Sequence, residues 1–359
     1  MAIFSAKNIS HYVLAICLVI LASYFGTQIK GAFTTNQNKD EYELIRKYLL
    51  NDSPLYGYNR PKIWIHSIYE YNARKWKSFG SRSSTDLNQP YLHATVKSVI
   101  NHCGNDFNVC LIDDDSFSRL LPEWSIVISK MPEPERSYYR EIAMVELLYV
   151  YGGMVVPNSF VCVRNLMPLY LEGIRDNRPF VLEKRNQHSQ IVNKETGSKR
   201  VMTADISFMG TLKQSPVIGD LIAFLKDRKT VGTRSNEFAF FDYISEWCNE
   251  QVFLEKMNLL DGKYAGIKSR VGRPILMEDI LAESEDGLDI CPHAAFGVYI
   301  PGKEILLRNK YQWFSVMNME ELLNTNLNIV PYMVQSLTTV PMVESPELGP
   351  SLGRSVISI

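Results

Sequence analysis

Short apolar runs alternate with longer segments of helical periodicity between residues 61 and 210, and this alternation limits the fold more than any other feature of the chain. The apolar runs predict strands at residues 61–66, 108–112, 154–156, 179–183 and 206–209. The periodic segments predict helices at residues 91–102, 113–121, 135–151, 215–228 and 236–253. Strands that alternate with helices form mostly parallel sheets, which bind ligands at the carboxyl ends of their strands. The sequence therefore predicts an α/β fold with a Rossmann-type, mostly parallel sheet flanked by helices.

Three other segments carry weaker signals. The strongly polar run at residues 184–200 predicts a mobile loop, which beside an active site would serve as a lid. Residues 297–300 and 304–308 predict a late hairpin around Pro301 and Gly302. The last segment, residues 331–359, holds four prolines and no helical period, so we expect a loosely held tail after a body at residues 61–330.

The amino-terminal region carries a long uncharged segment with an apolar centre. Residues 8–29 contain no charged side chain and are flanked by Lys7 and Lys30. A bilayer core requires about 20 such residues, so we expect a membrane anchor at residues 1–30 and a polar stem at residues 31–60. A cleaved signal peptide is the alternative, since the strongly apolar centre spans only about 14 residues. We favour an uncleaved single-pass anchor with the body luminal or extracytoplasmic.

Composition excludes one class of partner and leaves the cysteines open. With 38 basic and 39 acidic residues the net charge is −1, which gives no support for nucleic-acid binding. The six cysteines include no Cys-x-x-Cys pair and show no zinc site. Cys103 and Cys110 could form a disulfide in a luminal body, but we favour isolated buried thiols.

The order of elements resembles that of a known family over residues 61–230. The matching segments are Pro61–His66, Gln89–Asp114, the helix that ends at Gly152 and Gly153, and Ile206–Pro216. Together they resemble glycosyltransferases with a sugar-binding Asp-x-Asp motif, the GT-A family that includes capsular-polysaccharide and mannosyl transferases. Residues 79–83 and 311–314 resemble a subgroup found in large DNA viruses. The resemblance implies a GT-A-like fold and hexose transfer from a nucleotide sugar to a glycan or protein acceptor.

The residues after the glycine pair depart from that family. Its motif reads Gly-Gly-x-Tyr-x-Asp-x-Asp, and the two carboxylates hold a divalent metal ion against the donor diphosphate. In this chain the tyrosine falls on Val155, and the aspartates fall on Pro157 and Ser159, neither of which supplies a carboxylate. The Asp and Arg that the family places before the glycine pair fall on Glu141 and Met144.

Three hypotheses explain this departure. In the first, the fold binds sugar but no longer catalyses, and serves as a scaffold or a partner of active enzymes. In the second, a metal-independent transferase neutralises the diphosphate with Arg140, Lys184 or Arg185. In the third, the metal site has moved to Asp113-Asp114-Asp115, where Asp113 and Asp115 would hold Mn²⁺ or Mg²⁺. Apart from that case no cofactor is expected.

Candidate donor-binding residues follow from these hypotheses, and each also has a structural interpretation. Asp113 and Asp114 suit the start of a helix, where capping needs no metal. Gly152 and Gly153 lie before a strand, where glycine can adopt a backbone conformation with positive φ without contacting a ligand. The candidates are His66, Asp113, Asp114, Asp115, Arg140, Glu141, Gly152, Gly153, Asn158, Ser159 and Asp205. The expected partners are a nucleotide sugar, a glycan acceptor and a membrane at residues 8–29. The alternative class is a non-enzymatic membrane or virion component that uses the fold only for contacts.

Overall fold

The computed structural model describes residues 60–68, 89–122, 124–186, 197, 199–227 and 237–338. The chain divides into two units, Met1–Ser53 and Pro54–Ile359, and every described residue belongs to the second. The predicted anchor and the predicted stem at residues 31–60 therefore lie outside the described part, except for Arg60. Within the described residues, no helix combines the length and the apolar character needed to cross a bilayer.

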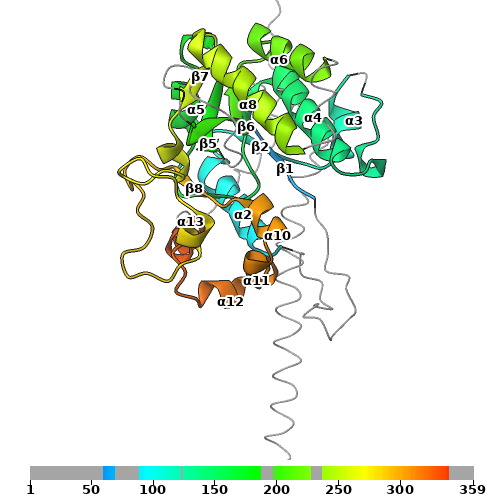
Figure 1. Ribbon diagram of the computed structural model, residues 1–359. Coiled ribbons are helices and arrows are strands. Elements are labelled where there is room, and N and C mark those ends of the chain that lie inside the picture. Colours follow the sequence, from blue (N-terminus) through cyan, green and yellow to red (C-terminus); the bar gives the residue numbers. More distant parts are fainter. Residues whose placement is uncertain are drawn as a thin grey trace, which may run out of the picture. The chain divides into compact units, whose positions relative to one another are not determined.

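A six-stranded sheet forms the centre of this unit (Figure 1). Its strands are β1 (Lys62–His66), β2 (Asn108–Ile112), β3 (Gly153–Val155), β5 (Phe180–Arg185), β6 (Met202–Thr211) and β7 (Asn258–Leu260). The order is β2-β1-β3-β6-β5-β7. β1 pairs in parallel with β2 and β3, and β5 pairs in parallel with β7, whereas β6 runs antiparallel to both of its neighbours. The prediction of a mostly parallel sheet is confirmed.

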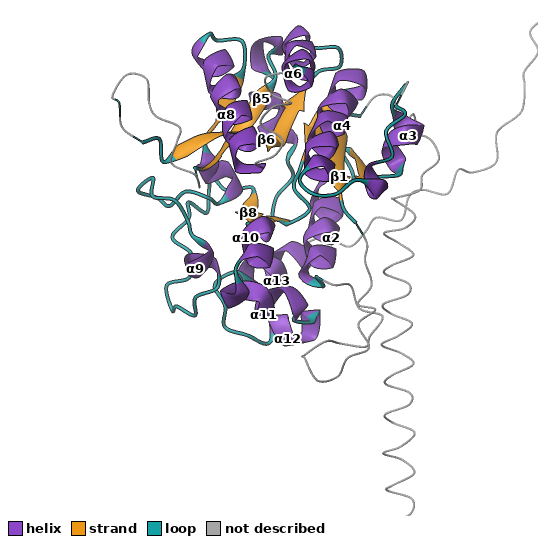
Figure 2. Ribbon diagram, turned by 45° about the vertical axis from the view of Figure 1, so that its right-hand side comes forward, coloured by secondary structure: helices purple, strands orange, loops and turns teal. Residues whose placement is uncertain are grey.

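Helices cover both faces of the sheet (Figures 1 and 2). They are α2 (Tyr91–Cys103), α3 (Ser116–Leu120), α4 (Glu135–Tyr151), α5 (Met167–Gly173), α6 (Pro216–Lys226) and α8 (Glu237–Phe253). Side chains of α4, α6 and α8 share one core with Trp64, Val155 and Val181 of the sheet. The apolar spacing that predicted these helices is the pattern that this core buries.

A second core lies around α2 and a smaller sheet. β4 (Phe160–Cys162) pairs antiparallel with β8 (Gly297–Tyr299). Short helices surround this pair (Figure 2): α9 (Met277–Ile280), α10 (Gly302–Leu307), α11 (Gln312–Val316), α12 (Met319–Leu323) and α13 (Val330–Thr338). Single-turn 3₁₀ helices occur at Ile128–Lys130, Arg175–Asn177, Gly262–Ala265 and Asn309–Tyr311. Apolar residues of this region, including Val161, Val298 and Met333, form a core separate from the one beneath α4.

Three predictions about the later segments are wrong. The predicted hairpin does not form, because Gly302–Leu307 is α10 and Gly297–Tyr299 pairs instead with Phe160–Cys162. The predicted loop begins later, since Lys184 and Arg185 continue β5 against β6. Its remaining positions from 187 to 196, and 198, lie outside the described residues. The expected tail begins with a helix, α13, whose Met333 is completely buried, and residues 339–359 lie outside the described part.

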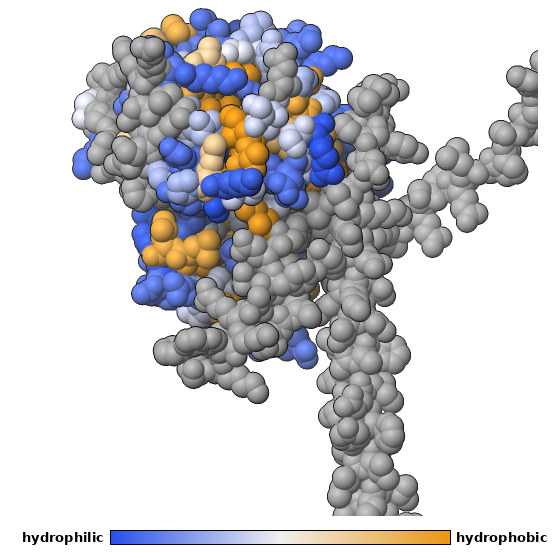
Figure 3. Space-filling model, turned by 90° about the vertical axis from the view of Figure 1, so that its right-hand side faces the viewer, coloured by the Kyte–Doolittle hydropathy of each residue, from blue (hydrophilic) through white to orange (hydrophobic). Residues whose placement is uncertain are grey.

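The surface of the described unit is mostly polar. Figure 3 shows a face on which hydrophilic residues surround smaller areas of hydrophobic ones. Strongly exposed apolar side chains among the described residues include Leu171 of α5, Phe253 of α8 and Leu307 of α10. Scattered exposed apolar residues are ordinary on soluble surfaces.

The described cysteines are all free thiols. Cys110 lies within β2 and does not pair with Cys103, so the alternative of a bridge between these two is wrong. Cys103 and Cys248 are buried, as favoured from the sequence. Cys103 nevertheless has a sulfur neighbour, Cys162, which the sequence did not indicate.

Candidate functional site at the carboxyl edge of the sheet

The predicted polar residues gather where the parallel strands end. His66 is the last residue of β1, and Asp113 follows the last residue of β2. Val155 of β3 pairs with Met209 of the reversed strand β6, so the residues that precede Met209 extend beyond the end of β3. The end of β5 and the first half of β6 therefore meet the ends of β1, β2 and β3 at one edge. We call this the carboxyl edge.

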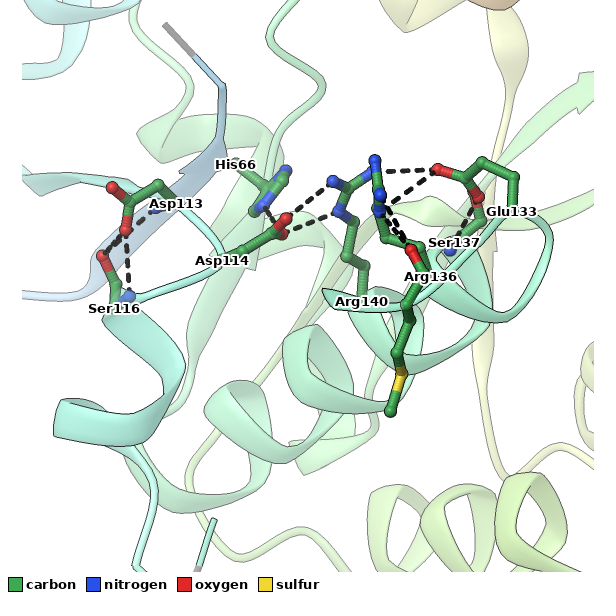
Figure 4. A network of polar contacts seen from close by, with 9 residues as sticks. His66, Asp113, Asp114, Ser116, Glu133, Arg136, Ser137 and Arg140 are labelled. Carbon is green, nitrogen blue, oxygen red and sulfur yellow. Dashed lines mark hydrogen bonds and ion pairs between the residues drawn. The ribbon is translucent and has the colours of Figure 1, made fainter. Parts of the chain in front are cut away.

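One side of the carboxyl edge is organised by Asp114. Arg140 of α4 donates two hydrogen bonds to the Asp114 carboxylate, from Nε to Oδ1 and from Nη2 to Oδ2, each 2.7 Å long. The Nε2 atom of His66 lies 3.0 Å from Oδ1 of the same carboxylate. Figure 4 shows these side chains pointing toward one another, with Glu133 beyond Arg140 at 3.6 Å. A forked, charge-assisted pair of this kind fixes both partners in orientation.

The charge of Asp114 is held strongly. Burial alone would raise the pKa of this carboxyl group. The hydrogen bonds and charges of Arg140 and His66 outweigh burial and hold the pKa of Asp114 well below its usual range. Asp114 is therefore ionised, and both of its carboxylate oxygens already contact side chains of the protein.

The two neighbouring aspartates have different surroundings. The Asp113 carboxylate accepts hydrogen bonds from the Ser116 backbone N–H at 2.9 Å and the Ser116 hydroxyl at 2.6 Å, as Figure 4 shows. Asp115 is exposed, and its side chain does not cap α3. Among the described residues no group of three or more His, Cys, Asp or Glu side chains is placed to hold a metal ion. Asp113 thus belongs to a turn with Ser116, and Asp114 belongs to an ion pair with Arg140.

The other side of the carboxyl edge contains a Lys–Asp pair between adjacent strands. Lys184 Nζ of β5 lies 2.8 Å from Asp205 Oδ2 of β6, and the two side chains are 29% and 11% exposed. The Ser207 hydroxyl also donates a hydrogen bond to Asp205. Tyr299 of β8 lies with its ring centroid 6.0 Å from Lys184 Nζ. This group brings together residues from three strands that are distant in sequence.

The pKa shifts in this group show how tightly its charges are coupled. Burial alone would lower the pKa of Lys184, but Asp205, Tyr299 and Glu141 raise it well above its ordinary value. Burial alone would raise the pKa of Asp205, but Lys184 and Ser207 lower it. Burial raises the pKa of Tyr299. Lys184 and Asp205 therefore stay ionised together, and Tyr299 stays neutral at physiological pH.

Helix α4 connects the two sides of the carboxyl edge. Arg140 points to Asp114, whereas the neighbouring Glu141 is close enough to influence the pKa of both Lys184 and Tyr299. Met144, one turn further along α4, is buried in the core beneath the helix. The Arg140 guanidinium is bound by Asp114.

The glycine junction has a conformational role. Gly152 and Gly153 have φ values of +68° and +94°, and a Cβ added at Gly153 would lie 2.2 Å from the Lys62 carbonyl oxygen. The Trp64 indole N–H donates to the Gly152 carbonyl oxygen at 3.0 Å. These positions require glycine so that β3 can lie against β1 after α4 ends.

Asn158 and Ser159, two of the predicted donor-binding residues, contribute to the framework through hydrogen bonds. The Ser159 hydroxyl is buried and donates to the Ile300 carbonyl oxygen at 2.6 Å. The Ile300 N–H donates in return to the Ser159 carbonyl oxygen at 3.1 Å. The Asn158 carbonyl oxygen accepts a hydrogen bond from the Thr95 hydroxyl of α2. This segment connects β3 to the second core, and the Ser159 hydroxyl takes part in that connection through its hydrogen bond to Ile300.

Sequence reasoning missed several members of these networks. Ser207 lies two residues after Asp205, and this spacing places both side chains on one face of a strand, a signal that could have indicated the contact. Glu133 precedes α4 by two residues in a Pro-rich turn and gave no comparable signal. Tyr299 comes from β8, whose pairing partner was not predicted, so nothing local marked it.

Fold and site together define an α/β protein with a mostly parallel sheet and two polar networks at its carboxyl edge. No protein-family model matches the chain, and no curated protein matches it. A solved structure described as PaToxG Glycosyltransferase is similar over 61% of this chain and 80% of its own length, with 12% sequence identity and a TM-score of 0.32. At that TM-score the similarity carries no argument about activity.

Proposed function

We propose that this chain is a glycosyltransferase-like protein that binds a nucleotide sugar at the carboxyl edge without a divalent metal ion, and that it does not perform metal-dependent hexose transfer. The sequence resemblance to the GT-A family supports the ligand class. The observation that carries the metal independence is the engagement of the acidic side chains there by protein donors. Asp113 accepts from Ser116, Asp114 from Arg140, and Asp205 from Lys184.

A metal ion would have to displace those donors. Mg²⁺ and Mn²⁺ require several oxygen ligands at short range. Taking Asp114 away from Arg140 would leave a partly buried guanidinium without its strongest partner, which costs several kcal/mol. The positions that supply carboxylates in the related family are Pro157 and the hydrogen-bonded Ser159. Both facts support binding without metal.

Metal-independent hexose transfer is the second candidate, and one residue favours it. Of the three cations considered from the sequence, Arg140 and Lys184 are already paired with carboxylates at 2.7 and 2.8 Å. Arg185, at the end of β5, is 33% exposed and lies 3.7 Å from Glu304, a looser contact. An arginine in that position is able to turn toward a diphosphate.

Thermal unfolding of the full chain in mild detergent tests the proposal. UDP-hexoses and GDP-hexoses are titrated with Mn²⁺ and with EDTA. Binding to the folded state raises the melting temperature, by a stabilisation of about 2.7 kcal/mol at one hundred times the dissociation constant. We expect one nucleotide sugar to raise the melting temperature equally in Mn²⁺ and in EDTA. A rise that EDTA abolishes would overturn metal independence.

Two variants separate the candidates in the same assay. Arg185→Ala should lower the nucleotide-sugar response if Arg185 contacts the diphosphate. Arg175→Ala is the matched control, because Arg175 is 63% exposed and forms an ion pair with Glu172 of the same segment. Product formation that depends on Arg185 would support metal-independent transfer. If no UDP- or GDP-sugar changes the melting temperature, the non-enzymatic scaffold is the better explanation.

Anchoring through residues 8–29, with the body extracytoplasmic, is also part of our proposal. Protease protection of the chain in microsomes tests it.

A further inference from the structure

Two buried cysteines lie against each other near the opposite end of the sheet. Cys103 ends α2 and Cys162 ends β4, and their Sγ atoms are 3.9 Å apart. Both residues are completely buried. The Cys103 carbonyl oxygen accepts a hydrogen bond from the Phe107 N–H just before β2 begins. This position is at the amino end of a strand, so the pair is separate from the polar networks of the carboxyl edge.

The two elements that carry these cysteines are fixed against each other without help from sulfur. The Ser98 hydroxyl of α2 accepts a hydrogen bond from the Cys162 backbone N–H at 2.8 Å. One turn earlier, the Thr95 hydroxyl donates to the Asn158 carbonyl oxygen, just before β4 begins. On its other side Cys162 pairs with Gly297 of β8. The apposition of Cys103 and Cys162 is therefore a property of how the framework packs.

The pair is exceptional among the cysteines of the described residues. Cys110, Cys248 and Cys291 are free thiols, and the Cys103–Cys162 contact is the one sulfur–sulfur contact in this part of the chain. Disulfide sulfurs are about 2.0 Å apart, so the thiols need to approach by about 1.9 Å. Side-chain rotation is the smallest movement that brings them together, because the backbones are already held side by side.

We propose that Cys103 and Cys162 form a structural disulfide when the chain folds in an oxidising environment, with a glutathione disulfide or an equivalent thiol–disulfide oxidant as the electron acceptor. One cysteine thiolate attacks the glutathione disulfide, which forms a mixed disulfide and releases one glutathione thiolate. The second cysteine thiolate attacks the protein sulfur of that mixed disulfide and releases the second glutathione. Two electrons pass to the oxidant, and the two thiol protons end on the two glutathione molecules.

Burial fixes when this step occurs. The thiolate is the reactive form, and burial raises the pKa of the Cys162 thiol well above its ordinary value. A small disulfide also has no access to a completely buried sulfur. The bond therefore forms while α2 and β4 are still coming together, and afterwards the same burial protects it from reductants. The oxidation state of the pair then records the redox conditions under which the chain folded.

Cell-free synthesis of the full chain in mild detergent tests this inference. The chain is made in a glutathione buffer that is either oxidising or reducing, and free thiols are then blocked with N-ethylmaleimide in denaturant. Peptide mapping without reductant should show Cys103 joined to Cys162 only after oxidising synthesis, in a peptide pair lighter by two hydrogen atoms. The bridge closes a loop of 59 residues, so the oxidised chain should melt about 10 °C higher than the reduced chain.

Matched variants make the result specific. Cys110→Ser should retain the cross-linked peptide, whereas Cys162→Ser should lose it and leave Cys103 blocked by the reagent. If Cys162→Ser fails to fold, the peptide map of the unaltered chain decides alone. Complete blocking of both cysteines after oxidising synthesis would overturn the inference, and so would a cross-link from Cys103 to a different cysteine.

Discussion

The two polar networks of the carboxyl edge differ in how many partners each central charge has. Asp114 is a carboxylate surrounded by donors: Arg140 contacts it twice and His66 once. Lys184 is an ammonium surrounded by acidic groups, and it alone contacts Asp205 as a cation among the described residues. Asp114 therefore keeps a partner if either Arg140 or His66 is removed, whereas Asp205 loses its cation if Lys184 is removed.

This difference shows what each network does for the fold. The Asp114 network joins the ends of β1 and β2, which pair with each other, to α4, which is a helix outside the sheet. The Lys184–Asp205 pair joins β5 to β6, which already share a hydrogen-bonded ladder. The first network therefore attaches α4 to the ends of two strands, and the second neutralises the Asp205 carboxylate in a partly buried position.

The largest effect should follow removal of Lys184. Lys184→Met leaves the partly buried Asp205 carboxylate without its cation, so the free energy of unfolding should fall by about 3–4 kcal/mol. Urea unfolding at pH 7 measures the change. Loss of a partner from a partly buried ion pair destabilises mainly because the remaining charge is uncompensated.

A second substitution isolates that cause. Adding Asp205→Leu to Lys184→Met removes the uncompensated carboxylate, so about half or more of the lost stability should return. If the double variant is less stable than Lys184→Met, uncompensated charge is not the reason for the loss.

Removal of Arg140 should cost less, because His66 still contacts Asp114. We expect Arg140→Met to lower the free energy of unfolding by about 2 kcal/mol at pH 7. If Arg140→Met lowers the free energy of unfolding more than Lys184→Met does, the remaining contact from His66 does not stabilise Asp114.

The pH dependence of this variant gives a further test. Because the pKa of Asp114 is lowered in the folded protein, its stabilising contribution is complete above the unfolded value of about 3.9 and is lost as pH falls toward the folded value. Without Arg140 the pKa of Asp114 is less depressed, so the variant loses less of this contribution. The stability difference between the two proteins should therefore shrink between about pH 4 and pH 2. A constant difference would mean that Arg140 acts through packing alone.

The first half of the body was predictable because its elements are locally encoded. α4 occupies Glu135–Tyr151 and β2 occupies Asn108–Ile112, both as the periodicity predicted. The segments that failed depend on distant partners. β4 is a three-residue strand that was not predicted, and the strand predicted at residues 297–300 pairs with it as β8, more than 130 residues later in the chain, instead of with the following segment. α13 begins with Val330-Pro331, and the proline that suggested a tail occupies the first turn of a helix, where proline is tolerated.

The site was predictable in place but not in contacts. Parallel strands predicted that His66 and Asp113, which lie at strand ends, would be at the carboxyl edge, whereas Asp205 reaches that edge because β6 runs antiparallel to its neighbours. The sequence could not indicate that Arg140 would contact Asp114. That contact depends on the position of α4 relative to β2, which is set by the core beneath the helix.

The smallest effect should come from an ion pair outside the carboxyl edge. Lys226 at the end of α6 pairs with Glu146 of α4, and the lysine side chain is 55% exposed. Exposed pairs contribute about 0.5 kcal/mol or less, since water and salt screen them and both side chains lose entropy. Lys226→Met should therefore change the urea midpoint very little, and added salt should remove the remaining difference. A loss above about 2 kcal/mol would place this pair with the edge networks. The stability losses at Asp114 and Lys184 would then have a common cause, which is that any change in the charges around α4 disturbs its packing. α4 carries Arg140, Glu141 and Glu146, one residue next to each of the three charge clusters.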